Sequence, residues 1–434
     1  MSRWYRIAPR ALIALMAMAC AATPGTSAAA AGYTYRVLYT FCSLANCADG
    51  QSPAATLLMD QAGNLYGTTR GGGGTIFRLT PRTKKKWKFE TLYNFCSQSN
   101  CASSNTPVII DIAGNLYGTT RQSSGNDGGL IFELKPNAAG GKWKYKQLYA
   151  FPCSDSGCPN GQLPSGLTYL GAASGQPYDG TSALFGTAAS GGTGTVAPLG
   201  VAFKLESQNN RWKQTVLYSF CSVAACADGA TPNAPIIDSA GRLWGTTSSG
   251  GNDRGGGVLF SISGRNESIE YEFCAVTEDC LDGSFPTSPV LLDKSGRLVG
   301  TTPLGGTFGA IPNGPGTLFA VSGGNEQVLY NFCSKANCAD GLHPSAGVIE
   351  DANGNIFGVT AEGGDANDGG VAFEFQNGAL QVLHKFGSAA GGTDGCAPLG
   401  GLIMDGAGNL YGTTSGCGAG SAGDGGTVFE LSPQ

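Results

Sequence analysis

The chain has 434 residues, of which 70 are glycine, 41% are hydrophobic and 13% are charged. This hydrophobic content suffices for a packed core and argues against a disordered chain, while the abundant glycine indicates a fold rich in turns. The net charge of −5 and the pI near 5.2 leave no basic footprint over the whole chain, which argues against a nucleic-acid partner.

The first residues have the pattern of a secretory signal peptide. Arg3, Arg6 and Arg10 precede the apolar run ALIALMAMACAA (11–22), and small residues follow it, so we expect residues 1–31 to be removed on export. The apolar run is shorter than the roughly 20 residues of a membrane span, and no later stretch reaches that length. Two alternatives stay open, an uncleaved anchor and a lipoprotein cleaved at Cys20, where Ala17 replaces the usual leucine.

Three short motifs recur seven times in fixed order along residues 32–434. The first is LYTF with its variants, which ends at Phe41, Phe95, Phe151, Phe220, Phe273, Phe332 and Phe386. The second is NLYGTT with its variants, whose glycines are Gly67, Gly118, Gly186, Gly245, Gly300, Gly358 and Gly412. The third is a Gly-rich stretch that leads into sequences such as TIFRL and LIFEL. The motifs therefore define seven repeated units.

Each unit is predicted to hold four short β-strands, because its aromatic and β-branched segments are separated by Gly, Asn, Asp and Pro. In the first unit these are an inner strand at 55–60, a second at 65–69, a third at 74–79 and an outer one at 89–95. Helical periodicity appears nowhere after the signal peptide.

Seven four-stranded units are typical of a β-propeller, which closes into a ring and so leaves only short sheet edges. The last unit lacks an outer strand, and residues 33–41 form an outer-type strand at the other end of the chain. We therefore expect one all-β domain, 32–434, a seven-bladed propeller of antiparallel blades closed by its N-terminal strand. An open solenoid is the alternative, although neither end has a polar capping repeat.

The cysteines predict seven disulfide bonds once Cys20 of the signal peptide is set aside. Six pairs are local in sequence: Cys42 with Cys47, Cys96 with Cys101, Cys153 with Cys158, Cys221 with Cys226, Cys274 with Cys280, and Cys333 with Cys338. Cys396 and Cys417 lie in two loops that emerge on the same face of an up-and-down blade, so they can form the seventh pair. Metal binding is the alternative, but export and the lack of nearby histidine favour disulfides.

The unit P…LLMD…GNLYGTT…GG…GTIFRL…LYNF resembles the GloVer tandem repeat of exported bacterial proteins described as choice-of-anchor tandem repeat GloVer-containing. The resemblance covers nearly all of the chain after the signal peptide. It implies a propeller-like repeat and an external location, without an assigned reaction. Such proteins often carry a C-terminal anchoring segment, whereas this sequence stops at FELSPQ, so we expect a soluble periplasmic or released form.

Few residues are suited to catalysis. His343 and His384 are the two histidines; His384 stands at the tyrosine position of the LYTF motif, which favours packing, and His343 lies in a loop. No nucleophile elbow, metal-binding histidine pair or phosphate loop occurs.

Carboxylates recur on the face predicted to carry the disulfides. Turns of the ADG type contain Asp49, Asp228, Asp282, Asp340 and Asp394, and the Gly-rich loops contain Asp127, Asp253, Asp368 and Asp424. A ring of acids at a propeller mouth could bind calcium or a sugar. Alternatively, aspartate is present because it tolerates the backbone of these turns. We expect no cofactor, with calcium as the one candidate.

Aromatic and basic residues gather on the opposite face. Trp87, Trp143 and Trp212 each stand eight residues before a motif phenylalanine, with Lys84, Lys85 and Lys86 beside the first. This pattern suits an acidic polysaccharide, lipid headgroups or a partner protein. The alternative is that the tryptophans pack between blades.

These observations favour a monomeric, non-enzymatic, exported binding or scaffold module for a glycan, an envelope component or a protein. The alternative is a polysaccharide lyase or hydrolase, which would need two acids about 5–10 Å apart in one pocket. The third unit is the longest, with extra residues at 170–185 and 190–201, and such insertions often carry specificity.

Overall fold

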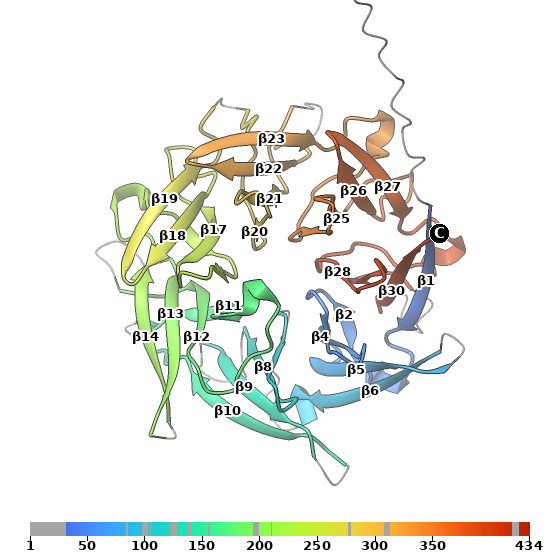
Figure 1. Cartoon of the computed structure of the whole chain (residues 1–434), viewed down its shortest axis with the longest axis horizontal. Coiled ribbons are helices and arrows are strands. Elements are labelled where there is room, and N and C mark those ends of the chain that lie inside the picture. The colour runs from blue at the N-terminus through green and yellow to red at the C-terminus, as the bar shows by residue number, and fades with distance from the viewer. Residues whose placement is uncertain are drawn as a thin grey trace, which may run out of the picture.

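The computed structural model describes residues 32–434, except 84–85, 98–102, 105, 122–127, 138–140, 155–156, 194–198, 210, 277–278, 308–312 and 419–424. Its strands form seven antiparallel sheets arranged around an axis (Figure 1). The predicted seven-bladed β-propeller is confirmed. The predicted signal peptide lies outside the described residues.

Each blade has four main strands, which follow one another from the axis to the rim. The inner strands are β3 (Leu58–Met59), β7 (Ile109–Ile110), β11 (Gln162–Tyr169), β16 (Ile236–Ile237), β20 (Leu291–Leu292), β24 (Ile349–Glu350) and β28 (Ile403–Met404). The second strands, which contain the LYGTT motif, are β4 (Leu65–Gly71), β8 (Leu116–Thr120), β12 (Leu184–Ser190), β17 (Leu243–Ser249), β21 (Leu298–Thr302), β25 (Ile356–Thr360) and β29 (Leu410–Thr414).

The third and outer strands complete the blades. The third strands are β5 (Thr75–Pro81), β9 (Leu130–Lys135), β13 (Val201–Gln208), β18 (Val258–Ser263), β22 (Thr317–Ser322), β26 (Val371–Gln376) and β30 (Thr427–Pro433). The outer strands are β6 (Trp87–Asn94), β10 (Lys144–Ala150), β14 (Arg211–Ser219), β19 (Asn266–Glu272), β23 (Asn325–Asn331), β27 (Ala379–Lys385) and β1 (Tyr33–Thr40).

Short elements complete the described secondary structure. Two further strands, β2 (Gln51–Pro53) and β15 (Ala230–Pro232), pair with β4 and β17. The helical segments are one-turn 3₁₀ helices: η1 (Ala45–Cys47), η3 (Phe95–Ser97), η4 (Ala172–Ser174), η5 (Ala224–Cys226), η6 (Ala336–Cys338) and η7 (Ala390–Gly392). Among the described residues, no helix is long and apolar enough to cross a membrane.

The ring closes as the repeat pattern predicts. Strand β1 pairs antiparallel with β30, with Tyr35 opposite Leu431 and Val37 opposite Phe429. The N-terminal strand is therefore the outer strand of the seventh blade, and every main strand belongs to one of the seven sheets.

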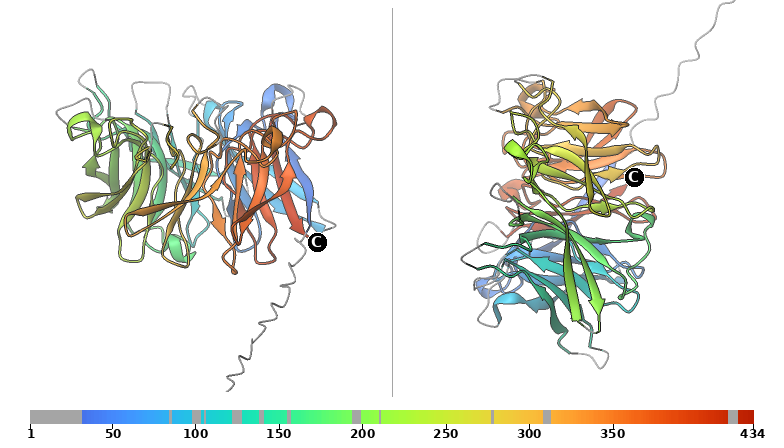
Figure 2. Two further views of the ribbon diagram at one scale, coloured as in Figure 1. Left: turned by 90° about the horizontal axis from the view of Figure 1, so that it is seen from above. Right: turned by 90° about the vertical axis from the view of Figure 1, so that its left-hand side faces the viewer.

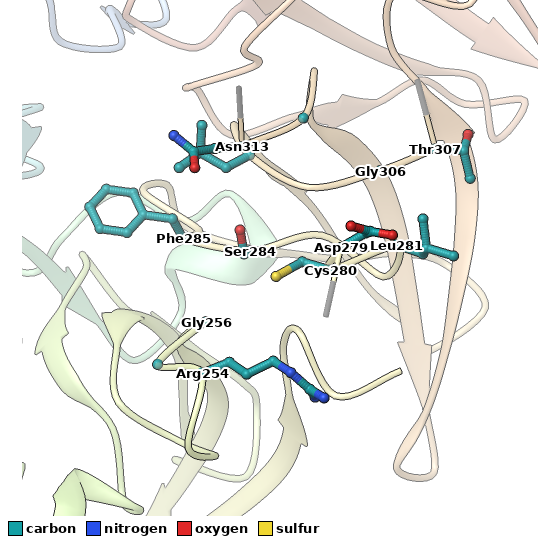
Figure 3. Close-up of a pocket in the computed structure, with 13 residues that line it drawn as sticks. Arg254, Gly256, Asp279, Cys280, Leu281, Ser284, Phe285, Gly306, Thr307 and Asn313 are labelled. Atoms are coloured by element: carbon teal, nitrogen blue, oxygen red, sulfur yellow. The ribbon is translucent and has the colours of Figure 1, made fainter. Parts of the chain in front are cut away.

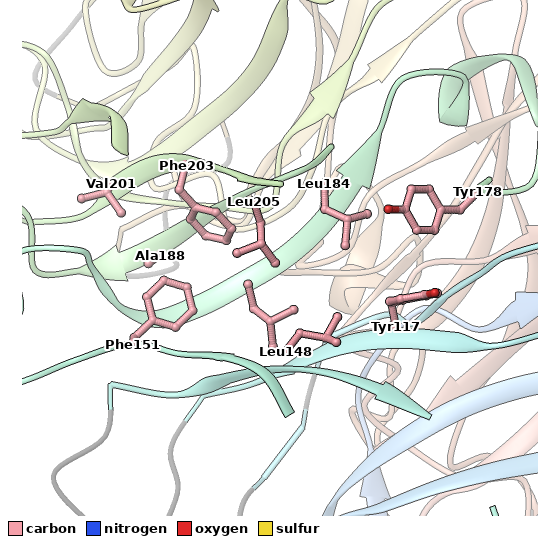
Figure 4. Close-up of a cluster of buried hydrophobic side chains, with 10 residues drawn as sticks. Tyr117, Leu148, Phe151, Tyr178, Leu184, Ala188, Val201, Phe203 and Leu205 are labelled. Carbon is pink, nitrogen blue, oxygen red and sulfur yellow. The ribbon is translucent and has the colours of Figure 1, made fainter. Parts of the chain in front are cut away.

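The hydrophobic core consists of layers between neighbouring blades. In the layer between the second and third blades, Leu148 of β10 and Phe151, which follows this strand, pack with Phe203 and Leu205 of β13, and all four are buried (Figure 4). Burying one such side chain contributes about 1.5–3 kcal/mol to folding. The recurring phenylalanines of the LYTF and TIFRL motifs are therefore packing residues.

The glycine of the LYGTT motif is required by the same packing. A Cβ atom on Gly118 would lie 2.7 Å from Cζ of Phe132, and the corresponding glycine of each other blade is covered in the same way by the phenylalanine of its third strand. Any larger residue at this position would have to displace a buried aromatic ring.

The first threonine of the same motif joins neighbouring blades. The Thr301 hydroxyl donates a hydrogen bond of 2.9 Å to the Ala346 carbonyl of the next blade. Equivalent bonds join Thr68 to Thr106, Thr187 to Asn233, Thr246 to Ser288, and Thr413 to Ala55 across the closure. The motif therefore specifies contacts around the ring as well as strands.

The insertion in the third unit packs on the second blade. Tyr178 forms a parallel bridge with Asp111, and its backbone exchanges hydrogen bonds with Ile110 and Ile112. Tyr178 is fully buried, with its ring edge-to-face against Tyr117 at 5.2 Å between centroids. The insertion thus extends the inner edge of a neighbouring blade.

Candidate binding site

The propeller is a disc with loops on both faces (Figure 2). We call one of them the disulfide face: it carries the loops from each outer strand to the next inner strand, and the loops between second and third strands. Its disulfide bonds join Cys42 to Cys47, Cys153 to Cys158, Cys221 to Cys226, Cys274 to Cys280, Cys333 to Cys338, and Cys396 to Cys417. These are predicted pairs; the partner predicted for Cys96, Cys101, lies outside the described residues. Bonds of this kind indicate an oxidising compartment outside the cytoplasm.

The aspartate of the ADG turn is buried within each cysteine loop that has one. Asp49 is fully buried. Its Oδ2 accepts hydrogen bonds from the Tyr39 hydroxyl at 2.8 Å and from the Ser43 N–H and hydroxyl, and its Oδ1 accepts from the Leu44 N–H. Burial alone would raise the pKa of Asp49, but these donors outweigh it and lower the pKa below the usual value.

The same arrangement recurs around the ring. Tyrosine hydroxyls donate to aspartates in the pairs Tyr218 with Asp228, Tyr271 with Asp282, and Tyr330 with Asp340, and His384 takes the place of tyrosine opposite Asp394 at 3.2 Å. Because these carboxylates are buried and hold the loops together, they do not form the open ring of acids that could bind calcium or a sugar. The hypothesis of a ring of acids that binds calcium or a sugar was therefore wrong for the ADG turns.

The two described acids of the Gly-rich loops, Asp253 and Asp368, are not part of an acid cluster either. Asp253 is exposed, and Asp368 accepts a hydrogen bond of 2.5 Å from the Gly363 N–H. Asp127 and Asp424 lie outside the described residues. Within the described part of the chain, no three His, Cys, Asp or Glu side chains meet as a metal site would require.

One loop position on the disulfide face has a strained backbone in six of the blades. In these blades the residue before the proline that opens the inner segment has φ between 51° and 60° and is not glycine: Ser52, Leu163, Thr231, Phe285, His343 and Ala397. Each of their N–H groups donates to a carbonyl in a loop of the preceding blade, as Phe285 does to Gly256 at 2.8 Å. Left-handed backbone costs about 1–2 kcal/mol for such residues.

Phe285 lies in a pocket of about 620 Å³ between the fourth and fifth blades. We call this the interblade pocket. Figure 3 shows Arg254 on one side, Asn313 on the other, and Asp279 and Ser284 between them. The pocket is also lined by Leu281, Leu304 and Thr307. Phe285 is 44% exposed, whereas the recurring phenylalanines of the blade motifs are buried.

The polar groups of the interblade pocket include one cationic side chain, Arg254, and one anionic side chain, Asp279. Arg254 is held in place by a hydrogen bond of 3.2 Å from its guanidinium to the Cys274 carbonyl. Asp279, Thr307 and Asn313 are exposed, so their side chains can meet a ligand. Asp279 is the single carboxylate among the described residues of the lining.

A second pocket, of about 700 Å³, lies on the opposite face beside the insertion of the third unit. Its lining is mainly apolar and includes Met59, Ile112 and Tyr169. Asp60 and Asp111 also line it, but each accepts several hydrogen bonds within its own turn, as Asp111 does from Asn115. This pocket therefore offers fewer polar groups to a ligand than the interblade pocket does.

The tryptophans of the opposite face pack against the blades. Trp87 contacts the Tyr411 ring edge-on at 6.1 Å, the Arg78 guanidinium lies 5.8 Å from the Trp143 ring, and Trp212 packs on the layer around Phe203. They support the packing alternative for these residues. Lys86 is exposed, whereas Lys84 and Lys85 lie outside the described residues, so the predicted basic patch remains a prediction.

Neither histidine is part of the interblade pocket. His384 is partly buried, in line with the packing interpretation, and this burial, partly offset by Asp394, lowers its pKa. His343 Nδ1 lies 3.0 Å from a Glu362 carboxylate oxygen. Sequence reasoning found neither Phe285 nor Arg254; the repeated X-Pro position was the signal that could have indicated Phe285.

The protein is a seven-bladed β-propeller with disulfide bonds in the loops of one face. The sequence matches the family model described as the Gloeobacter/Verrucomicrobia repeat over residues 25–182 and 168–339. The chain therefore belongs to the family of proteins built from this repeat, as the GloVer resemblance implies. No curated protein matches the sequence.

Solved structures resemble the chain in fold. The extracellular domain assigned to a hybrid two-component system of B. thetaiotaomicron matches with a TM-score of 0.51 and 12% identity, over 92% of this chain and 39% of that one. A gluconolactonase of Xanthomonas campestris matches with a TM-score of 0.33 and 11% identity, over 62% and 69% of the two chains. A Trichoderma reesei protein of carbohydrate-active enzyme family AA12 matches with a TM-score of 0.40 and 11% identity, over 93% of this chain and 96% of that one.

Proposed function

We propose that the protein is an exported binding module that holds a glycan in the interblade pocket. The observation that carries the proposal is Phe285, an aromatic side chain kept partly exposed and at positive φ inside a polar pocket. The equivalent position holds residues as small as Ser52 and Ala397 in other blades, so the fold does not require a large side chain there. We therefore infer that the phenyl ring of Phe285 serves contact with a ligand.

The composition of the pocket suits a sugar. The apolar C–H face of a sugar ring packs on an aromatic ring, and its hydroxyls need both donors and acceptors. Arg254 supplies donors, Asp279 supplies acceptors, and Asn313 supplies both. A volume of about 620 Å³ is in the range of small-molecule sites, which is enough for a short oligosaccharide.

The pocket is better suited to binding than to cleavage. Glycosidases need a pair of acids about 5–10 Å apart, and the described lining includes Asp279 as its one acid. The disulfide bonds and the signal-peptide pattern of residues 1–31 support a location in the periplasm or outside the cell.

A glycan array with the purified exported form, followed by calorimetry on the best glycan, tests the proposal. We expect Phe285→Ala to weaken binding at least about tenfold, which corresponds to about 1.4 kcal/mol. Leu163→Ala is the matched control, because Leu163 has the same strained backbone in the third blade but is absent from the interblade pocket lining. Equal binding by wild type and Phe285→Ala, or no glycan bound, would overturn the proposal.

A further inference from the structure

A third pocket, separate from the interblade pocket, lies on the axis of the ring. Its volume is about 170 Å³, and we call it the axial pocket. All seven blades line it, mainly with small residues such as Ala55, Gly347 and Gly401. Its wall contains one large charged residue, Arg121.

The neutral polar side chains of the axial pocket are already engaged in the ring. Ser165 donates to the Pro232 carbonyl, Ser345 to the His343 carbonyl, and Asn233 to the Pro286 carbonyl. The remaining members also have hydrogen-bond partners within the protein: Thr56, Thr106, Thr287 and Ser288. These groups are therefore part of the framework of the ring.

Arg121 is the exception. It is the one charged residue among those that line the axial pocket, and the described residues provide its side chain with no hydrogen bond, ion pair or aromatic partner. Its backbone is fixed, because its N–H donates to the Ser103 carbonyl at 3.1 Å. Burial lowers the pKa of the guanidinium, so the protein bears the cost of removing this charge partly from water.

The repeat shows that arginine is not needed here for folding. Arg121 follows the LYGTT motif, and the corresponding residues of the third to seventh blades are Ala189, Ser248, Pro303, Ala361 and Ser415. Arg70 has the same position in the first blade, but it is exposed and does not line the axial pocket. The fold thus accepts small neutral residues where the second blade places a cation next to the axis.

We propose that Arg121 binds a small monocarboxylate anion in the axial pocket. A planar guanidinium matches a carboxylate with two parallel hydrogen bonds, and the neutral lining leaves one positive charge to be balanced by one negative charge. Cavities of about 150 Å³ accommodate a ligand of six carbon atoms, so the pocket takes an anion the size of acetate or lactate. The threonine and serine framework keeps the wall rigid around it.

Calorimetry with acetate tests this site, with acetamide as the uncharged molecule of the same shape. We expect a dissociation constant of about 0.1–10 mM for acetate, because a four-atom ligand has little surface to bury, and binding at least about tenfold weaker for acetamide. Arg121→Gln should lose acetate binding, whereas Arg121→Lys should retain part of it. Arg70→Gln is the matched control and should bind acetate as wild type does.

Each result decides the proposal. Absence of saturable acetate binding, equal binding of acetamide, undiminished binding by Arg121→Gln, or an equal loss in Arg70→Gln would overturn it. Thermal melts establish whether each variant is folded. If Arg121→Gln is not folded, Arg121→Lys and a chloride titration of the wild-type protein test the site instead. Displacement of acetate by equimolar chloride would also overturn the proposal. Phe285→Ala should bind acetate normally, so failure at the interblade pocket is distinguishable from failure here.

Discussion

The imidazole of His384 lies parallel to the ring of Tyr35, with 3.7 Å between ring centroids and 2° between planes. Tyr35 belongs to β1 and His384 to β27, so the contact joins the N-terminal strand of the seventh blade to the sixth blade. Tyr39 and Phe89 form the same kind of stack at 3.9 Å between the seventh and first blades. The seventh blade is thus joined to both neighbouring blades by a stacked ring pair, with histidine replacing tyrosine in one of them.

Replacing His384 by tyrosine should preserve this contact and reduce the acid sensitivity of the fold. Burial lowers the pKa of His384 below the usual histidine value of about 6.5, so the unfolded chain binds the proton more readily than the folded one. The stability from the neutral imidazole is present above about pH 6.5 and is lost as pH falls toward the folded pKa. Urea unfolding at pH 7 and pH 5 should show a smaller loss for His384→Tyr than for wild type; an equal loss would contradict this.

Glu267 and Glu326 should give the stability a pH dependence opposite to that of His384. Burial, with Asp228 and Glu270 nearby, raises the pKa of Glu267 to about 7, and burial with Asp282 raises that of Glu326 to about 7. The folded protein keeps protons that the unfolded chain releases above about pH 4.5, so stability is lost as pH rises from there to about 7.

The double variant Glu267→Gln, Glu326→Gln removes this effect. Both side chains are partly open to solvent, so after allowance for screening we expect a gain on the order of 1 kcal/mol for each at pH 8 and little gain at pH 5. Melting temperatures at the two pH values measure it. A gain of the same size at both values would show that the glutamates do not titrate in this range.

The repeat made most of the fold predictable. Strand positions, blade number, the role of residues 33–41 and the Cys396–Cys417 bond all follow from local patterns that recur in register. The role of Asp49 was harder to predict, because its donors come from Tyr39 and from the loop itself. Yet tyrosine stands ten residues before the aspartate in Tyr39–Asp49, Tyr218–Asp228 and Tyr330–Asp340, and this constant spacing could have indicated the pairing.

The pockets could not be predicted in this way. The interblade pocket combines loops of two blades, and the axial pocket combines residues of all seven, so neither is contiguous in sequence. Arg121 differs from its repeat neighbours, but position alone does not distinguish it from Arg70, which has the same motif and a different exposure. Side-chain burial, which depends on the surrounding loops, separates the two.

Two disulfide bonds should differ in their contribution to stability. The Cys42–Cys47 bond spans 5 positions and the Cys396–Cys417 bond spans 21. Chain-entropy estimates give about 2 kcal/mol for the shorter loop and about 3.4 kcal/mol for the longer one. Denaturant unfolding of the two double serine variants should therefore show the greater loss for Cys396→Ser, Cys417→Ser, and the reverse order would rule out this explanation.

The hydroxyl group of Thr301 should contribute more to stability than the shape of the Thr301 side chain does. Thr301→Val removes the donor to the buried Ala346 carbonyl, at an expected cost of about 1–3 kcal/mol in the free energy of unfolding. Valine fits sterically, since Val359 occupies this position in the sixth blade and is buried. Thr301→Ser keeps the hydroxyl and should lose less. If the two variants are equally stable in denaturant, the bond between blades is not the reason for the threonine.

Phe285→Gly should separate stability from binding. Glycine adopts φ near 60° without steric cost, so the substitution removes a strain of about 1–2 kcal/mol, against which glycine adds about 0.5–1 kcal/mol of backbone entropy. Because the phenyl ring is 44% exposed, it contributes little packing, and we expect a net gain of up to about 1 kcal/mol in unfolding free energy together with loss of glycan binding. Leu163→Gly relieves the same strain outside the pocket and should keep binding. A destabilised Phe285→Gly would mean that the ring is held there by the fold, and retained binding would mean that the ligand does not touch it.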